Sequence, residues 1–260
     1  MKLCALRCLA LSFLLFPLLA GSAHANSINL GTAGSFGVLA GSTVTNTGSS
    51  VITGNVGVWP GTAITGFPPG IVIGGTIHAG DAVAHNAQTD LTTAYNVAAG
   101  MPSTVNLTGQ DLGGMVLTPG VYHFDSSAQL TGTLTLDNLG NPNALFVFQI
   151  GSTLTTASGS AVLFTNSLAT NVFWQVGSSA TLGTTTAFAG NILALTSITL
   201  NTGASISCGS ALARNGAVTL DTNVITNCGA QTTVPEPGTV GLMGSGLAIL
   251  IGAVRRKMRT

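Results

Sequence analysis

The chain has 260 residues, of which only 5% are charged, and its formal net charge is zero. Six of its seven basic residues lie within 1–25 or 255–260, so Arg214 is the only Lys or Arg between these segments. Proteins bind nucleic acids and anionic membranes through clustered Lys and Arg side chains. The long central part of the chain has no such cluster, which excludes both as ligands for it.

The segment 1–25 has the three parts of a secretory signal peptide. Lys2 and Arg7 form a short basic region, an apolar stretch covers 9–20, and Ala23-His24-Ala25 is the small-residue pattern at which signal peptidase cuts. The apolar stretch is short for a membrane span, which needs ~20 residues. We expect cleavage by signal peptidase after Ala25, and a mature domain of residues 26–233 outside the cytoplasm.

One segment of this domain has helical periodicity. Between Gly80 and Ala99 the apolar residues recur at the spacing of one helix face, and Gly100 and Pro102 stop the pattern. The rest of the domain has short runs of β-branched residues separated by turn-forming residues, which is typical of packed strands. We expect a mainly β domain with one amphipathic helix at about 80–99 that covers apolar surface left open by the strands.

Short motifs recur in the second half of the chain. Thr-Leu pairs begin at Thr153, Thr181, Thr199 and Thr219, with one long step and two shorter ones, and a second apolar series runs through 146–149, 172–175, 191–194 and 210–213. Two interleaved series with one shared period indicate a solenoid, because one coil cannot bury its own apolar side chains and must stack on its neighbours. We expect Leu154, Leu182, Leu200 and Leu220 to point inward as a ladder, the flanking Thr to point outward or lie at corners, and a loop such as 166–170 to absorb the longer step.

Cys208 and Cys228 are the two cysteines of the mature domain, and one coil of the repeat separates them. Neighbouring coils are separated by ~4.7–4.9 Å, which fits the ~4.4–6.8 Å between the Cα atoms of a disulfide. An even pair in an exported domain favours a disulfide that joins the last coil to the one before it. A zinc site is the alternative, but the pair has no nearby His ligands. We therefore expect no metal and no cofactor.

Residues 234–260 contain a second sorting signal. An apolar run over 238–254, followed by four basic residues, comes after a rigid tetrapeptide of Val234, Pro235, Glu236 and Pro237. The run can nearly cross a bilayer as a transmembrane segment, with the basic end in the cytoplasm. This tail resembles the PEP-CTERM signal that exosortases recognise in Gram-negative bacteria. The resemblance implies an exosortase-type processing enzyme as a partner and a protein that is secreted or at the cell surface, with membrane contact only through this segment. An ordinary C-terminal anchor is the alternative.

Several stretches of the mature domain together resemble the microbial ice-binding proteins. They read SFGVLA at 35–40, GFPPG at 66–70, LTPGVY at 117–122, NVFWQVG at 171–177, ALAR at 211–214 and VTLDTN at 218–223. The resemblance covers about 30–228 and implies a right-handed discontinuous β-helix, a solenoid with one long α-helix packed alongside. It also implies an extracellular protein that binds ice, with antifreeze or recrystallisation-inhibiting activity, through a flat Thr/Ser-rich face.

The resemblance implies a set of binding residues. Family members carry motifs of Thr, then Ala or Gly, any residue, and Thr or Asn; the motif at 202–205 comes close, and those at 156–159, 186–189 and 222–225 match in part. Thr suits such a face because its hydroxyl donates and accepts hydrogen bonds and its χ1 is stiff. The candidate ice-binding residues are Thr156, Ser158, Thr184, Thr186, Thr202, Ser205, Ser207, Thr222 and Thr226. The run Thr43-Val44-Thr45-Asn46-Thr47 is another candidate surface.

Two other classes of protein could share such a fold. Carbohydrate-cleaving β-helix enzymes need clustered carboxylates, or a Lys or Arg to stabilise charge. The mature domain has no Glu and no Lys, and its Asp residues are scattered, so we interpret Asp125 near His123 as a structural pair and expect no enzyme. A surface adhesin or exopolysaccharide-matrix protein is the alternative to ice binding, because a flat polar face can also bind a glycan matrix.

Overall fold

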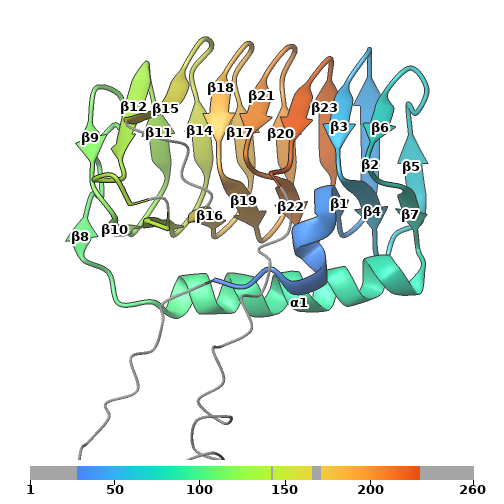
Figure 1. Ribbon diagram of the computed structural model, residues 1–260, viewed down its shortest axis with the longest axis horizontal. Coiled ribbons are helices and arrows are strands. Elements are labelled where there is room, and N and C mark those ends of the chain that lie inside the picture. The colour runs from blue at the N-terminus through green and yellow to red at the C-terminus, as the bar shows by residue number, and fades with distance from the viewer. Residues whose placement is uncertain (1–27, 142, 166–170, 229–260) are drawn as a thin grey trace, which may run out of the picture.

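Three parallel β-sheets form the walls of a solenoid, and one helix runs along its length (Figure 1). The structure, a computed structural model, describes residues 28–141, 143–165 and 171–228. The expected signal peptide, the expected loop at 166–170 and the expected sorting tail fall outside these residues. The fold class expected from the sequence, a mainly β solenoid with one long helix, is confirmed.

Each complete coil contributes one strand to each sheet, and the coils at the two ends are incomplete. Sheet A contains β1 (Phe36–Ala40), β4 (Asn55–Val58), β7 (Ile77–Ala79), β8 (Val105–Asn106), β10 (Gly120–Phe124), β13 (Leu145–Ile150), β16 (Asn171–Val176), β19 (Asn191–Ala194) and β22 (Ala211–Ala213). Sheet B contains β2 (Thr43–Thr47), β5 (Ala63–Thr65), β11 (Ala128–Leu130), β14 (Leu154–Thr156), β17 (Ala180–Leu182), β20 (Ile198–Leu200) and β23 (Val218–Asp221). Sheet C contains β3 (Val51–Thr53), β6 (Ile71–Ile73), β9 (Val116–Leu117), β12 (Thr133–Asp137), β15 (Ala161–Thr165), β18 (Ala187–Ala189), β21 (Ser205–Ser207) and β24 (Val224–Thr226).

The coils are not stacked in chain order. In sheet A, β1 lies between β4 and β22, and in sheet B, β2 lies between β5 and β23, so the amino-terminal coils stack on the carboxyl-terminal coil. Helix α1 (Ala82–Gly100) then carries the chain from β7 at one end of the solenoid to β8 at the other (Figure 1). This arrangement confirms a discontinuous solenoid.

The core follows from the alternation of side chains along each strand. Leu154, Leu182, Leu200 and Leu220 are all buried, as expected from the repeat. The expected register is wrong at the first of them, however, because Leu154 pairs with Ala180 while Leu182 pairs with Leu200. The first coil is therefore displaced by two positions from the register that the Thr-Leu motifs indicated. A shift of two positions keeps every side chain on the same face of a strand, so alternation alone cannot detect it.

The second series needs a similar correction. The sequence motifs aligned Phe173 with Ile192, whereas the structure pairs Trp174 with Ile192, one position further along. The next pair, Ile192 with Ala211, has the register that the motifs gave. The first mismatch arises because both strands are buried along most of their length, and a run of apolar residues carries no alternation to fix its register.

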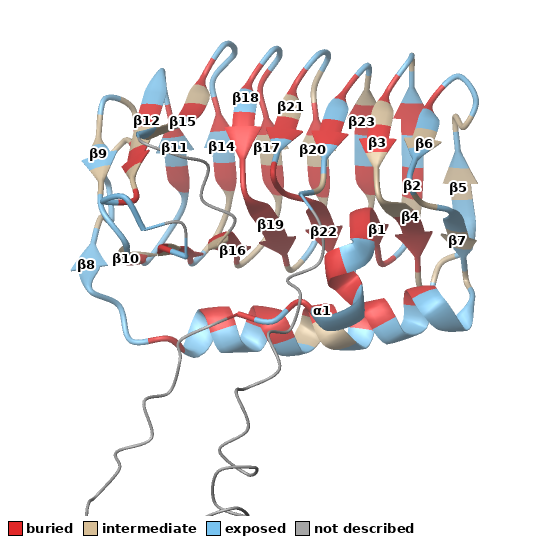
Figure 2. Cartoon of the chain, viewed as in Figure 1, coloured by how far each residue is buried: buried red, intermediate tan, exposed pale blue. Residues whose placement is uncertain are grey.

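Helix α1 covers the outer face of sheet A. Its buried residues include Ala87, Leu91 and Ala94, which pack with Phe173 and Leu212 of the sheet in a second apolar cluster (Figure 2). Small residues on this helix face allow the close approach. The observed bounds match the helix expected at about 80–99 to within two residues at each end.

Polar side chains of the solenoid hold the helix in place. Gln149 Nε2 donates hydrogen bonds to the carbonyl oxygens of Ala98 and Met101, at 2.8 and 2.7 Å, which satisfies groups that a helix carboxyl end leaves unpaired. Further along the helix, the guanidinium of Arg214 lies 4.7 Å from the centre of the Tyr95 ring. Arg214, the one Lys or Arg between residues 26 and 233, thus helps to hold the helix.

The helix begins at a carboxylate that makes stability dependent on pH. Asp81 Oδ1 accepts a hydrogen bond from the Ala84 backbone N–H at 2.9 Å, and Asp81 Oδ2 lies 2.7 Å from His78 Nδ1. These two hydrogen bonds, the backbone one first, lower the pKa of Asp81 below its usual value. Its stabilising contribution is therefore present above the unfolded pKa of about 3.9 and is lost as the pH falls through the folded pKa.

We expect the Tm to be constant from neutral pH down to about pH 5 and to fall as the pH is lowered below ~4. Asp125, whose pKa is lowered first by its hydrogen bond with His123, adds to the same loss. Thermal melts of the parent and of an Asp81→Asn variant, followed by circular dichroism from neutral to strongly acidic pH, check this. A variant whose Tm falls as steeply with acid as the parent's would contradict the assignment to Asp81.

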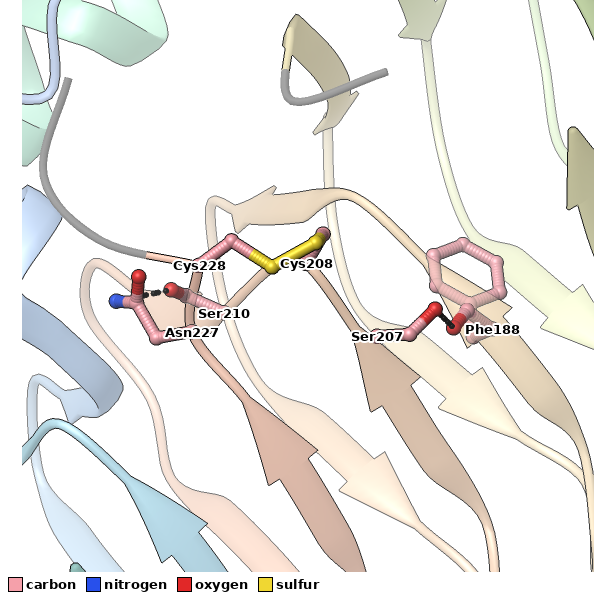
Figure 3. Close-up of a disulfide and its surroundings, with 6 residues drawn as sticks. All are labelled: Phe188, Ser207, Cys208, Ser210, Asn227 and Cys228. Atoms are coloured by element: carbon pink, nitrogen blue, oxygen red, sulfur yellow. Dashed lines mark hydrogen bonds between the residues drawn. A yellow bond between two sulfur atoms is a disulfide. The ribbon is translucent and has the colours of Figure 1, made fainter. Parts of the chain in front are cut away.

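A disulfide joins two adjacent coils at the end of the described chain (Figure 3). Cys208 follows β21 and Cys228 follows β24, and their Cα atoms are 4.6 Å apart. This confirms the disulfide that the spacing of the two cysteines predicted. Beside it, Asn227 Nδ2 donates to the carbonyl oxygens of Gly34 and Phe36, so the last coil is also bonded to the first residues of the described chain.

Removing the disulfide should cost about 3 kcal/mol, the loss of chain constraint for a closed loop of roughly this size. The two cysteines are separated by 20 positions in the sequence. The expected result for a Cys208→Ser/Cys228→Ser double variant is a Tm lower by about 6–12 °C, since each kcal/mol shifts Tm by roughly 2–4 °C in a domain of this size. Adding reductant should lower the Tm of the parent similarly and leave the variant unchanged. An unchanged Tm in the double variant would show that the bond does not stabilise the fold.

Candidate functional site

Sheets B and C are the walls of the solenoid that are open to solvent. Sheet A is covered by α1 and has mostly buried residues on its central strands (Figure 2). On sheet B the residues alternate strictly, with buried residues on either side of an accessible one in strands such as β14, β17 and β20. Any extended binding surface built from repeated strands must therefore lie on sheet B or sheet C.

The outer face of sheet B has one residue type in register across six coils. Strand pairing aligns one outward residue of each strand with an outward residue of the next. In order along the solenoid axis these residues are Thr155, Thr181, Thr199, Thr219, Thr45 and Thr65. We call this row the threonine column. Gln129 continues it at one end.

The hydroxyl groups of the threonine column are not used by the fold. None of these six side-chain hydroxyls has a hydrogen-bond partner within the described ranges. In the adjacent outward row, by contrast, Ser127 Oγ lies 2.8 Å from Thr153 Oγ1, and Ser197 Oγ accepts from the Ala217 backbone N–H at 3.2 Å. The column thus presents free donors and acceptors, flanked by a row of hydroxyls that help to hold the strands together.

The spacing of the column is that of a parallel sheet. Neighbouring threonines are one strand apart, ~4.7–4.9 Å, and outward positions along one strand repeat every ~6.6 Å. Each Thr offers a hydroxyl that can donate and accept, beside a methyl group that water cannot hydrogen-bond. Stiff χ1 angles keep these groups in place before any ligand arrives. A regular, uncharged array of this kind matches a ligand that is itself periodic.

The structure does not support two of the expected binding residues. Thr156 and Thr186 are 3% and 0% exposed, and their hydroxyl oxygens lie 2.8 Å from each other. Thr156 Oγ1 also accepts from the Gly183 backbone N–H at 2.9 Å. These threonines stabilise the inside of the corner between sheets B and C and cannot reach an outer surface. The partial Thr-Ala motifs at 156–159 and 186–189 gave no indication of this burial, because they do not show which side of the strand each Thr faces.

The other seven candidates are exposed or half-buried but do not lie on sheet B. Ser158, Thr184, Thr202 and Thr222 lie in the turns between sheets B and C, whereas Ser205, Ser207 and Thr226 lie on strands of sheet C. The turn residue Thr202 donates a short hydrogen bond to Asp221, and Thr222 donates to the same carboxylate at 3.1 Å. The nine candidates therefore belong to three separate places.

Sheet C is a less regular surface. Its outward residues include exposed Leu163, Val224, Ile71 and Ile73, mixed with alanines and with hydroxyl residues. Neither outward row of sheet C keeps one residue type along its length, because alanine, valine, isoleucine, leucine and hydroxyl residues are mixed in them. Sheet B is the wall whose repeat is chemically uniform.

The threonine column could have been found from the sequence if the outward-facing residues of each strand had been assigned correctly. In each Thr-Leu pair at 181, 199 and 219 the Leu is buried, so the residue before it must point outward. The alternative surface at 43–47 lies on the same wall, because Thr45 pairs with Thr219. That contact joins residues near opposite ends of the mature domain, and no local pattern predicts it.

Acid–imidazole pairs in this structure have structural partners. His123 Nε2 lies 3.0 Å from Asp125 Oδ1, whose carboxylate also accepts from Thr108 Oγ1 at 3.1 Å. Within the part of the chain that the structure describes, no group of three or more His, Cys, Asp or Glu side chains could hold a metal ion. In the same residues no helix has the length and apolar character of a membrane span.

Two known sequence families match the chain. Residues 38–226 match the family described as ice-binding-like, and residues 233–257 match the PEP-CTERM protein-sorting motif. An ice-binding protein from Nostoc sp. (strain HG1) is 58% identical over 166 residues, which are 64% of this chain and 61% of that protein. Ice-binding protein 1 from Shewanella frigidimarina is 38% identical over 100 residues, 36% of this chain and 11% of that protein. The chain thus spans less than two thirds of the length of these curated relatives.

Solved structures are similar over more of the chain. An ice binding protein from an Antarctic biological consortium has a TM-score of 0.73 at 52% identity, over 76% of this chain and 90% of its own. An ice-binding protein from the Antarctic ascomycete Antarctomyces psychrotrophicus has a TM-score of 0.73 at 44% identity, over 77% of this chain and 98% of its own. Since the family match covers most of the solenoid, the chain belongs to the ice-binding-like family.

Proposed function

We propose that this protein binds ice through the outer face of sheet B, with the threonine column as the main contact. The observation that carries the proposal is the unbroken row of six in-register threonines whose hydroxyls have no partner in the described structure. Relatives named as ice-binding proteins, in the sequence and in the structural comparison, support the choice of ice as the ligand.

Ice is a ligand with a fixed lattice, so a binder gains from rows of groups at fixed spacing. The threonine hydroxyls can hold water molecules at regular intervals, while the methyl groups between them limit other arrangements of that water. Because strand pairing holds each Thr backbone and χ1 is stiff, little side-chain entropy is lost on adsorption. Strongly hydrated charges would disturb such a layer, and no Lys, Arg or Glu lies on sheet B. Asp221 at the end of β23 is the one charged residue in the described strands of this sheet, and its carboxylate accepts hydrogen bonds from Thr202 and Thr222.

Export is part of the proposal. We infer that residues 1–25 direct secretion and are removed, and that an exosortase-type enzyme recognises the tail whose sorting motif matches residues 233–257. The membrane is contacted only through that tail. The protein then acts outside the cell, either released or at the surface, where a threonine face could contact ice.

The experiment is to measure thermal hysteresis and ice recrystallisation inhibition on the exported, processed protein, with its disulfide formed. We expect shaped ice crystals and slower recrystallisation than in buffer or with an unrelated protein of the same concentration. A well-folded protein with neither activity would refute the proposal. Binding to a glycan array by that inactive protein would instead favour the matrix-protein alternative for the same face.

A further inference from the structure

Both ends of the solenoid expose free strand edges. At one end the last strands of sheets A, B and C are β7, β5 and β6, and at the other end they are β8, β11 and β9 (Figure 1). The edge of β11 is covered in part, because Asp111 pairs with Gln129. Every strand in the three sheets is paired in parallel, so all strands of one sheet point the same way. A second copy moved along the solenoid axis would therefore present strands of the correct direction to all three edges.

The end strands carry exposed apolar residues at both ends. Ile73 of β6 and Ile77 of β7 are 50% and 45% exposed, and Val105 of β8 and Val116 of β9 are 44% and 66% exposed. Proteins usually protect free strand edges with charged residues, especially Lys, or with proline. None of the six end strands contains a charged Lys, Arg, Asp or Glu, or a proline. At one end sheet B is protected by Asp111, a charged residue that pairs with Gln129 of β11. For the end strands of sheets A and C, shortness is the protection that remains.

These apolar residues are aligned through the whole molecule. One row of paired residues in sheet A begins at Val105, passes through Tyr122, Phe148, Trp174, Ile192, Ala211, Val38 and Val56, and ends at Ile77. Stacking two copies in register would therefore place Ile77 of one beside Val105 of the next.

A second row runs along sheet C. Val116 pairs with Thr135, and Thr135 pairs with Leu163. Ala161 pairs with Ala187, and the same offset two residues further along aligns Leu163 with Ala189. The row continues through Ser207, Thr226 and Thr53 to Ile73. The same movement that joins Ile77 to Val105 thus brings Ile73 beside Val116.

We propose that a second copy of this chain stacks head to tail on the first, with β7 and β6 of one copy against β8 and β9 of the next. Such a contact is heterologous and does not close on itself, so further copies can add. End strands of two or three residues make each contact weak, and association depends on concentration.

A cross-linking experiment tests the register. Exported proteins carrying Ile77→Cys and Val105→Cys are mixed at high concentration and oxidised, since adjacent strands at ~4.7–4.9 Å suit a disulfide. The two cysteines of the described structure are already bonded to each other, so they supply no free thiol. We expect several-fold more cross-linked dimer from this mixture than from Ile77→Cys with Val116→Cys, which belong to different rows. Equal yields from the two mixtures, or no dimer from either, would overturn the proposal.

Sedimentation velocity over a concentration series tests the association itself. We expect the mean mass of the parent to rise with concentration, and an Ile73→Lys/Ile77→Lys variant with an unchanged circular dichroism spectrum to stay monomeric. A parent that remains a monomer at every concentration would overturn stacking. This outcome is separate from the proposed function, because a monomer can still show thermal hysteresis and a stacked protein can lack it.

Discussion

Replacing Thr219 by tyrosine removes most of the thermal hysteresis, whereas the same replacement at Thr226 leaves it close to the parent value. Both residues are exposed threonines of the same coil, on β23 and β24 respectively. They differ in the wall on which they lie, since Thr219 is inside the threonine column and Thr226 is on sheet C. Comparing the two variants therefore tests the effect of the face alone, because the residue type and the coil are the same.

The physical reason for the loss is the flatness of the column. A tyrosine ring at position 219 stands above its neighbours Thr199 and Thr45 and holds an ice surface away from them. Binding through many weak contacts along one plane is lost when the plane cannot be reached. We expect at least about a tenfold reduction, the change that ~1.4 kcal/mol of binding free energy produces.

The measurement is thermal hysteresis against protein concentration for the parent and both variants, each checked by circular dichroism and a thermal melt. An outward residue with no hydrogen-bond partner should tolerate the change without unfolding. Loss of activity in the Thr226→Tyr variant alone would move the site to sheet C, which contains the candidate residues Ser205, Ser207 and Thr226. Full activity in both variants would rule out either face as the main contact.

The sequence predicted the parts of the fold that local patterns determine. Helix α1 could be found because its apolar residues repeat at helical spacing and Gly100 and Pro102 mark its end. The disulfide could be found because one coil separates Cys208 from Cys228. Each of these inferences uses residues within about one coil of each other, where spacing translates directly into distance.

The proposed binding face was harder to predict from the sequence. It depends on which residues of each strand point outward and on pairing between strands that are far apart in the sequence. Assigning the outward residues of β14 and β17 required knowing that Thr155, not Thr153, stands beside Thr181. A shift of two positions preserves the inward and outward pattern and so leaves no trace in the sequence. The last third of the column, Thr45 and Thr65, joins the wall only because the amino-terminal coils stack on the carboxyl-terminal one.

That return of the chain also explains why the solenoid should unfold as one unit. In a simple solenoid each repeat contacts only its neighbours, and stability is nearly a sum of local terms. Here the coil at the amino end of the chain is bonded to the last coil through β1–β22 and β2–β23, while α1 packs along both. A substitution that weakens one interface between coils therefore also destabilises segments that are distant in the sequence.

Truncating Trp174 to alanine should destabilise the domain more than any other substitution considered above. Trp174 is 0% exposed and stacks on Phe148, with ring centres 3.8 Å apart, and it lies 4.8 Å from the Phe188 ring. Its indole Nε1 donates to the Ala189 carbonyl oxygen at 3.0 Å. The residue therefore links two walls, sheets A and C, through the core.

Loss of a large buried aromatic side chain costs about 3–5 kcal/mol, because the cavity it leaves is only partly filled by relaxation. For a domain of this size the expected fall in Tm is about 6–20 °C. A Trp174→Phe variant retains a ring for the stack on Phe148 and should lose less, since it gives up part of the volume and one hydrogen bond, worth about 1–3 kcal/mol if the carbonyl is left unpaired. Thermal melts of the three proteins at neutral pH check the order parent, Phe, Ala.

The same two variants separate stability from binding. Trp174 is buried and does not reach the outer face of sheet B, so each variant should retain the parent's thermal hysteresis in the cold as long as it remains folded there. Hysteresis that falls in proportion to the unfolded fraction would agree with this. A folded Trp174→Ala variant with no hysteresis would instead show that core packing sets the flatness of the threonine column, because a cavity in the core would then have distorted the wall beside it.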